Sequence, residues 1–161
     1  MIRKILKGIL VIICMITIFY FSSDNGDESS YKSDSVILKV SSFLGVHHLS
    51  KSDRESLIDT FVVPVRKSAH FTIYFILGIA LVSFLREFSI PIQKLLLLSI
   101  FLAFLYACSD EVHQLFIPGR TGRAFDVFID TLGASSGVLL YYLLFRKKLK
   151  EVCYEQKERA C

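Results

Sequence analysis

Three otherwise apolar stretches of the chain each carry a small set of ionisable or amide side chains near one end. The sets are Arg66 with His70, Asp110 with His113 and Gln114, and Asp126 with Asp130. Residues three or four apart share one face of a helix, so each set would project from its helix in one direction. Carboxylates beside His and Arg side chains can transfer protons or hold an anion. The spacing therefore predicts one polar site where three helices meet.

The connection over residues 117–123 has the sequence IPGRTGR, which adds two arginines beside that site. Its Pro-Gly pair favours a tight turn, and guanidinium groups bind carboxylate or phosphate in bidentate fashion. We therefore expect an anion-accepting pocket. The expected ligand-binding residues are Arg66, His70, Asp110, Glu111, Gln114, Arg120, Arg123, Asp126 and Asp130.

Other interpretations of these polar residues remain open. Arginines 66, 120 and 123 can simply neutralise the four carboxylates and lock the helices together, or the cluster can conduct ions or protons. An enzyme would use Glu111, His113 or Asp126 as general acid or base. His70 and His113 with Asp110 and Glu111 could ligate a metal ion, but their spacing matches no recognised ligand set, so we expect no metal and no cofactor. His47-His48 is expected to be an interfacial pair.

Familiar catalytic and nucleic-acid-binding signatures are missing from the sequence. It contains no HExxH, GxSxG, Walker or dinucleotide-binding motif. Its lysines and arginines flank apolar segments and form no cluster that would bind nucleic acid. The sequence therefore names no reaction.

The elements that must position the site are membrane helices. Of the 161 residues, 53% are hydrophobic and 21% are charged, a balance typical of proteins that use lipid as solvent. A spanning helix needs roughly 20 mainly apolar residues. Four segments meet this requirement, so we predict an all-α bundle of four transmembrane helices in a single domain over residues 1–150. The predicted helices are 5–21, 64–85, 92–116 and 126–145, with an outer loop over 22–63 and a tail over 151–161.

The distribution of cations predicts the orientation. If the N-terminus is cytoplasmic, the inner segments hold 11 Lys and Arg in 32 residues, whereas the outer segments hold 8 in 62. The positive-inside rule then places both termini in the cytoplasm and the polar site outside. We expect the first helix to be a retained anchor, because Phe21-Ser22-Ser23-Asp24 offers no good cleavage site for a signal peptidase.

The outer loop contains two weaker helical signals. The polar stretch 22–33 is predicted to be a flexible loop, and apolar residues from Val36 to Leu44 recur at the spacing of a short interfacial helix. Ser52 with Glu55 resembles a capping box for a second short helix, and Pro64 is expected to open the next membrane helix. Gly133 and Gly137 form a GxxxG pattern, which favours close packing within the bundle over dimerisation.

Several motifs, in order, resemble the VanZ-like family of bacterial membrane proteins. They are Phe21-Ser22-Ser23, RKSAHF at 66–71 with Tyr74 and Leu77, SDEVHQLF at 109–116, Pro118-Gly119-Arg120, Asp126, and DTLG at 130–133. The resemblance covers all but the outer loop and the tail. It implies a small four-helix protein whose motif positions here are Arg66, His70, Glu111, Gln114, Arg120, Asp126 and Gly133. Many members have Asn where this chain has Asp130.

The resemblance also shapes the expected function. The family takes its name from a member associated with low-level teicoplanin resistance. We expect a protein of the bacterial plasma membrane whose outward pocket binds an envelope component, either a cell-wall precursor or a lipid head group, and so alters glycopeptide tolerance. The expected partners are membrane lipids, not nucleic acid, and a homo-oligomer stays open. The alternatives are a membrane enzyme that modifies a lipid-linked precursor and a structural or partner subunit.

Overall fold

The computed structural model describes residues 1–43, 50–88 and 90–160 and is mostly helical, with no strand in those ranges. Four of its helices are long and apolar enough to cross a membrane. The prediction of an all-α bundle with four transmembrane helices is therefore confirmed. The elements are α1 (Ile2–Ser22), α2 (Gly26–Phe43), α3 (Lys51–Leu85), the short 3-10 helix η1 (Arg86–Phe88), α4 (Ile92–Gln114) and α5 (Ala124–Ala160).

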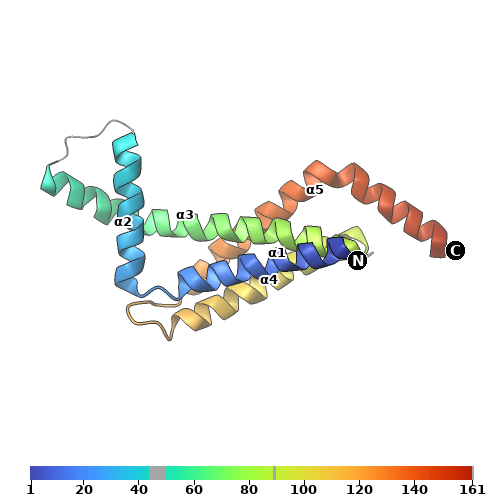
Figure 1. The fold of residues 1–161 in the computed structure, drawn as a ribbon, viewed down its shortest axis with the longest axis horizontal. Coiled ribbons are helices and arrows are strands. Elements are labelled where there is room, and N and C mark those ends of the chain that lie inside the picture. The colour runs from blue at the N-terminus through green and yellow to red at the C-terminus, as the bar shows by residue number, and fades with distance from the viewer. Residues whose placement is uncertain (44–49, 89, 161) are drawn as a thin grey trace.

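The four long helices lie alongside one another and alternate in direction (Figure 1). The N-terminus and η1 lie at one end of the bundle. The other end carries α2, which runs across the bundle, and the connection from α4 to α5. We call this the α2 end. It contains the end of α1, the middle of α3, the end of α4 and the start of α5, so all the predicted polar sets come together there.

The bundle buries small, aliphatic and aromatic side chains in its interior and exposes many other large apolar side chains on its outer faces. Ala103, Ala107 and Ala134 are fully inaccessible and belong to one buried cluster with Tyr74, which is also fully inaccessible. Aliphatic residues on the outer faces of all four helices are exposed, with Leu97 accessible over 69% of its surface. Since lipid tails are as apolar as leucine, close packing of small residues holds membrane helices together. This pattern fits a bundle surrounded by lipid.

The most extensive helix pair, α3 with α5, depends on glycines. A Cβ added to Gly137 would lie 2.1 Å from the carbonyl oxygen of Phe75, and one added to Gly133 would lie 2.4 Å from that of Phe71. Gly78 of α3 likewise lies against the backbone of Ala134. The GxxxG pattern therefore packs inside the bundle, as the sequence indicated, and Gly78 is a third member that the pattern alone did not reveal.

The segment after α1 differs from its prediction. Residues 22–33 were predicted to be a flexible loop, but α2 begins within them at Gly26. Contacts with α3 favour the helix: Ser33 and Ile37 are buried, and the Arg66 guanidinium donates to Ser30 Oγ at 3.1 Å. The apolar face predicted from Val36 onward belongs to this helix, whereas Leu44 and His47-His48 lie outside the described residues.

Helix α3 is longer than predicted and passes through Pro64 without a break. Its N-cap is Ser50, whose hydroxyl accepts from the Asp53 backbone amide, so the cap lies two residues before the predicted Ser52-Glu55 pair. Proline leaves the carbonyl four residues earlier, at Thr60, without its amide partner. Both residues are exposed, so water or lipid head groups can reach that carbonyl. The prediction that a helix begins at Pro64 is therefore wrong.

The other two helix ends also shift. Helix α4 was predicted to end at residue 116, but it ends at Gln114, and tight turns follow it. Helix α5 continues to Ala160, although it was expected to end at residue 145 and leave a tail. Residues 146–160 contain no Gly or Pro and are rich in Lys, Glu and Arg, which favour helices, so the loss of apolar character does not end the helix.

Candidate functional site

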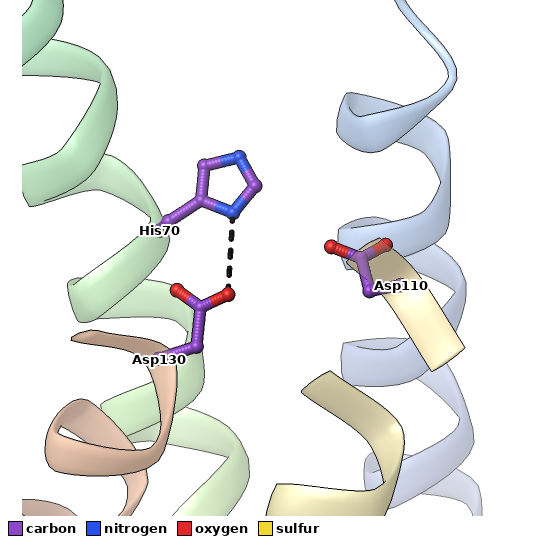
Figure 2. Close-up of side chains that lie close together, drawn as sticks. All are labelled: His70, Asp110 and Asp130. Carbon is purple, nitrogen blue, oxygen red and sulfur yellow. Dashed lines mark ion pairs between the residues drawn. The ribbon is translucent and has the colours of Figure 1, made fainter. Parts of the chain in front are cut away.

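Three polar side chains from three helices meet inside the α2 end. His70 of α3, Asp110 of α4 and Asp130 of α5 turn toward one another (Figure 2). Each offers a ligand atom, and these atoms all lie within 4.8 Å of one another. His70 Nδ1 lies 3.9 Å from Asp130 Oδ2. Asp110 and Asp130 are almost inaccessible, at 3% and 1% exposure. We call these residues the buried triad.

One oxygen of Asp110 is firmly held and the other is not. Its Oδ2 accepts a hydrogen bond from Ser22 Oγ at 2.8 Å and another from Gln114 Nε2 at 3.2 Å. Its Oδ1 is buried, and no described atom within hydrogen-bond distance pairs with it. The same is true of Asp130 Oδ2 and of the Tyr74 hydroxyl. Buried polar atoms are normally satisfied, so these unpaired atoms need a partner from outside the protein, such as water or an ion.

Glu111 fastens the α4–α5 connection to the end of α4. Its Oε2 accepts from the backbone amide of Arg123 at 2.8 Å, and its Oε1 accepts from Gln114 Nε2 at 3.2 Å. Gly119 supplies the positive φ of 74° that the turn requires. A Cβ on Gly122 would lie 2.7 Å from the Glu111 carbonyl oxygen, so the chain returns tightly against α4. The two arginines that flank Gly122 are thereby held beside the triad.

Arg120 joins three elements at once. Its guanidinium and Nε–H donate to the carbonyl oxygens of Phe21 and Asp24 at 3.1 Å, and its Nη1 donates to Gln114 Oε1 at 3.4 Å. Burial, together with the nearby Arg66, lowers the pKa of the Arg120 guanidinium from its usual range. Two guanidinium groups that repel one another near a cavity favour an anion between them.

Arg66 has spare hydrogen-bonding capacity. One of its terminal nitrogens donates to Ser30, but its buried Nε–H has no hydrogen-bond partner within the described ranges. Lys67, by contrast, forms an ion pair with Asp126 and lies 4.9 Å from the centroid of the Phe125 ring. Neither Arg66, Arg120 nor Arg123 pairs with the four carboxylates among the residues described. Among these residues the structure therefore shows no direct ion pair of the arginine–carboxylate kind considered from the sequence.

His113 lies apart from the other predicted site residues. Its ring stacks on Phe19 at a centroid distance of 4.4 Å, and its Nε2 lies 3.1 Å from Ser23 Oγ. Three residues along a helix correspond to about 300°, so His113 points about 60° to one side of Asp110. That rotation turns it toward α1, while Gln114 faces inward. His113 therefore does not line the polar cavity.

Two cavities adjoin at the α2 end. The polar cavity has a volume of about 150 Å³, and the apolar cavity has a volume of about 220 Å³. Arg66, His70 and Arg120 line both. The polar cavity is further lined by predicted residues Glu111, Gln114, Arg123, Asp126 and Asp130. The apolar cavity is further lined by Ile18, Phe21, Val36, Val65, Ala69 and Ile73, with Asp24, Lys32 and Ser33.

Some residues of the site were not identified from the sequence. Ser22 anchors Asp110, and Lys67 pairs with Asp126, yet neither was among the predicted site residues. The Phe21-Ser22-Ser23 and RKSAHF motifs were the signals that contained them. Tyr74 also belonged to a motif, and its hydroxyl is one of the unpaired buried atoms.

The comparisons with known proteins agree with this architecture. A search of curated proteins and a search of solved structures each returned no match. A family model described as VanZ/LLP1 matches residues 8–146, a range that begins within the first membrane helix, contains the other three membrane spans and includes every residue that lines the two cavities. The chain therefore belongs to the VanZ/LLP1 family and is a multi-pass membrane protein.

Proposed function

We propose that the α2 end binds an amphiphile with a phosphorylated head group, a membrane lipid or a lipid-linked cell-wall precursor. The observation that carries the proposal is the adjacency of the two cavities. One is polar and the other apolar, and Arg66, His70 and Arg120 stand at their shared wall. A molecule that occupies both must have a charged part and a hydrocarbon part joined close together.

The polar cavity suits an anion of phosphate size. One water molecule needs about 10–15 Å³ of cavity volume, so a cavity of about 150 Å³ has room for on the order of ten waters. Arg66, Arg120 and Arg123 line it without carboxylate partners in the described chain, and guanidinium groups bind phosphate through paired N–H donors. Lys67 is committed to Asp126. The free donors therefore belong to the arginines.

The apolar cavity suits the first part of a hydrocarbon chain. Aliphatic and aromatic side chains of α1, α2 and α3 form most of its wall, among them Ile18, Val36 and Ile73. Many outward-facing residues of the bundle are apolar, so a chain leaving this cavity can continue into the bilayer. The amphiphile would thus enter from the membrane and not from water.

The proposed location is the bacterial plasma membrane, with both termini cytoplasmic and the α2 end outside. The density of Lys and Arg in the segments at the opposite end supports this orientation. A ligand bound at the α2 end would then lie in the outer leaflet, where it would be exposed to glycopeptide antibiotics. We extend the proposal to tolerance of teicoplanin-type compounds, for which the support is the resemblance to the VanZ-like family.

A second candidate function is chemistry on the bound head group. The observation that favours it is the pairing of His70 with Asp130 beside the phosphate-sized cavity, because a carboxylate can orient an imidazole that transfers a proton. Glu111 and Asp126 line the same cavity, whereas His113 does not. If the protein is an enzyme, cells that express wild type should contain a changed lipid or precursor that is missing from cells that express His70→Gln. Identical lipid profiles at matched protein levels would exclude this chemistry and leave lipid binding as the proposed function.

Lipid retention after purification tests the binding proposal. Wild type, Arg66→Gln and Arg120→Gln would be purified in mild detergent, and bound phospholipids and polyprenyl phosphates counted by native mass spectrometry. Hydrogen bonds to charged groups contribute about 1.5–3 kcal/mol, so each substitution should weaken retention by about 10- to 150-fold. Arg86→Gln is the matched control, because Arg86 lies at the opposite end and donates to Tyr141.

Folding must be separated from binding in this experiment. Arg120 also holds two backbone carbonyls, so its loss could loosen the α1–α2 connection. Within the described residues the Arg66 side chain makes a single hydrogen bond, to Ser30, so its variant is the cleaner probe. Equal lipid retention by wild type and Arg66→Gln, with both proteins monodisperse, would refute the proposed binding site.

A further inference from the structure

We propose that the buried triad of His70, Asp110 and Asp130 is a binding site for a divalent transition-metal ion. His70 and Asp130 of this triad line the polar cavity, and the inference does not rest on the proposed lipid. It differs from the metal set considered from the sequence, because His113 and Glu111 are not part of it and Asp130 is.

The geometry is the first support. One ligand atom from each residue lies within 4.8 Å of the others, and the three come from three different helices (Figure 2). Ligand atoms about 2.0–2.2 Å from a shared ion lie at most about 4.4 Å apart. A side-chain adjustment of about 1 Å would therefore close the site around an ion. Side chains from three packed helices can make that adjustment without moving the backbone.

The unpartnered oxygens are the second support. Asp110 Oδ1 and Asp130 Oδ2 are buried and have no hydrogen-bond partner in the part of the chain that the structure describes. Asp110 and Asp130 are 97% and 99% buried, from exposures of 3% and 1%. An unsatisfied buried acceptor costs about 1–3 kcal/mol, and more when it is charged. A cation bound by both oxygens would remove that cost.

The protein's own cations do not supply this charge. Lys67 pairs with Asp126, and Arg66 and Arg120 donate to Ser30, Gln114 and backbone carbonyls. Among the Lys, Arg and His side chains of the described residues, only His70 lies within 4.0 Å of a triad carboxylate, at 3.9 Å from Asp130. Two buried carboxylates therefore face a single imidazole, and a doubly charged ion balances them.

The donor set indicates which ions fit. Imidazole favours Zn²⁺ and its transition-metal neighbours, and carboxylates also suit Mn²⁺, so a set of one nitrogen and two oxygens selects a divalent transition metal over Ca²⁺. Three protein ligands leave at least one position for water or a phosphate oxygen. Ser22 and Gln114 hold the other oxygen of Asp110, which is the outer-shell support typical of metal ligands.

Metal content of the full-length protein tests the proposal. Protein in detergent would be stripped with a chelator, incubated with micromolar Zn²⁺ or Mn²⁺, desalted and measured by elemental mass spectrometry. Wild type should retain about one ion per chain, and His70→Gln and Asp130→Asn should each retain at least tenfold less. His113→Gln is the matched control, because His113 lies on α4 outside the triad and should not affect retention.

A second measurement covers variants that fail to fold. The melting temperature of wild type should rise when the preferred ion is restored and fall when a chelator is added, because an ion that binds only the folded state stabilises it. No retained ion and no shift in melting temperature would overturn the proposal in favour of a shared proton in the triad. Retention that survives Asp130→Asn but not His113→Gln would also overturn it.

Discussion

Substituting alanine for the glycines between α3 and α5 sets two effects of opposite sign against each other. Alanine in a helix is favoured over glycine by about 0.8–1.0 kcal/mol, so propensity alone predicts that Gly137→Ala stabilises the protein. The structure predicts the reverse. The new Cβ would lie 2.1 Å from the Phe75 carbonyl oxygen, whereas carbon–oxygen contacts lie at about 3.3 Å or more. The two backbones must separate by roughly 1 Å.

The magnitude follows from what that separation disrupts. Overpacking a close contact costs typically about 1–3 kcal/mol, and here the clash is with backbone, which cannot rotate away. Because the backbone cannot yield, the cost should lie in the upper part of that range, at about 2–3 kcal/mol. After the gain in propensity, Gly137→Ala should destabilise the protein by about 1–2 kcal/mol, and Gly133→Ala should behave similarly. The double variant should cost less than the sum, because the first substitution already moves the helices apart.

Unfolding in mixed micelles measures these differences. Helical circular dichroism would be followed as the proportion of SDS rises, for wild type and each variant. Gly8→Ala is the control, since its added Cβ would meet only the Phe84 ring, at 3.2 Å, and a ring can shift. Stabilisation of Gly137→Ala by as much as Gly8→Ala would refute the close approach of α3 and α5.

Three further experiments test two other contacts and the orientation in the membrane. Tyr106→Phe removes the hydrogen bond from Tyr106 to the Met15 carbonyl oxygen at 2.6 Å and should cost about 0.5–1.5 kcal/mol in the same unfolding assay, whereas Tyr31→Phe at an exposed position should change little. A double-mutant cycle on Lys67→Met and Asp126→Asn should give a coupling of only about 0.2–1 kcal/mol that shrinks in high salt, because both side chains are 28% exposed; a larger, salt-independent value would contradict this. In a variant otherwise free of cysteine, Thr121→Cys should react with an impermeant maleimide in intact cells, whereas Cys153 alone should react only after permeabilisation. The opposite labelling pattern would invert the proposed orientation.

The membrane helices were predictable because their signal is strong and local. Lipid demands a long apolar run for each crossing, and four such runs stand out in the sequence. Helix ends were less predictable. Pro64 indicated a helix start, but exposure of the preceding turn lets α3 continue through it. The apolar signal ends near residue 145, yet helix-favouring residues carry α5 further.

The polar residues were predictable as a group but not as partners. Helical spacing indicated that Arg66 and His70 share a face, and the structure brings both to the wall between the two cavities. Spacing could not show that Asp110 and Asp130, which are 20 positions apart, lie beside His70, because that depends on how α4 and α5 pack. It also could not distinguish Gln114, which faces inward, from His113, which stacks on Phe19.

The most direct test of the proposed binding site is photo-crosslinking with a diazirine-bearing phosphatidic acid in native membranes. Mapped by mass spectrometry, crosslinks to the apolar cavity at Val36 or Ile73 should be competed by unlabelled phosphatidic acid and should be lost in Arg66→Gln. Crosslinks to Leu97, which faces outward at 69% exposure, should be insensitive to both. If neither the competitor nor Arg66→Gln changes the labelling at any of the three residues, a specific site at the α2 end is contradicted. The crosslinks would then report only the general contact between the helices and the surrounding lipid.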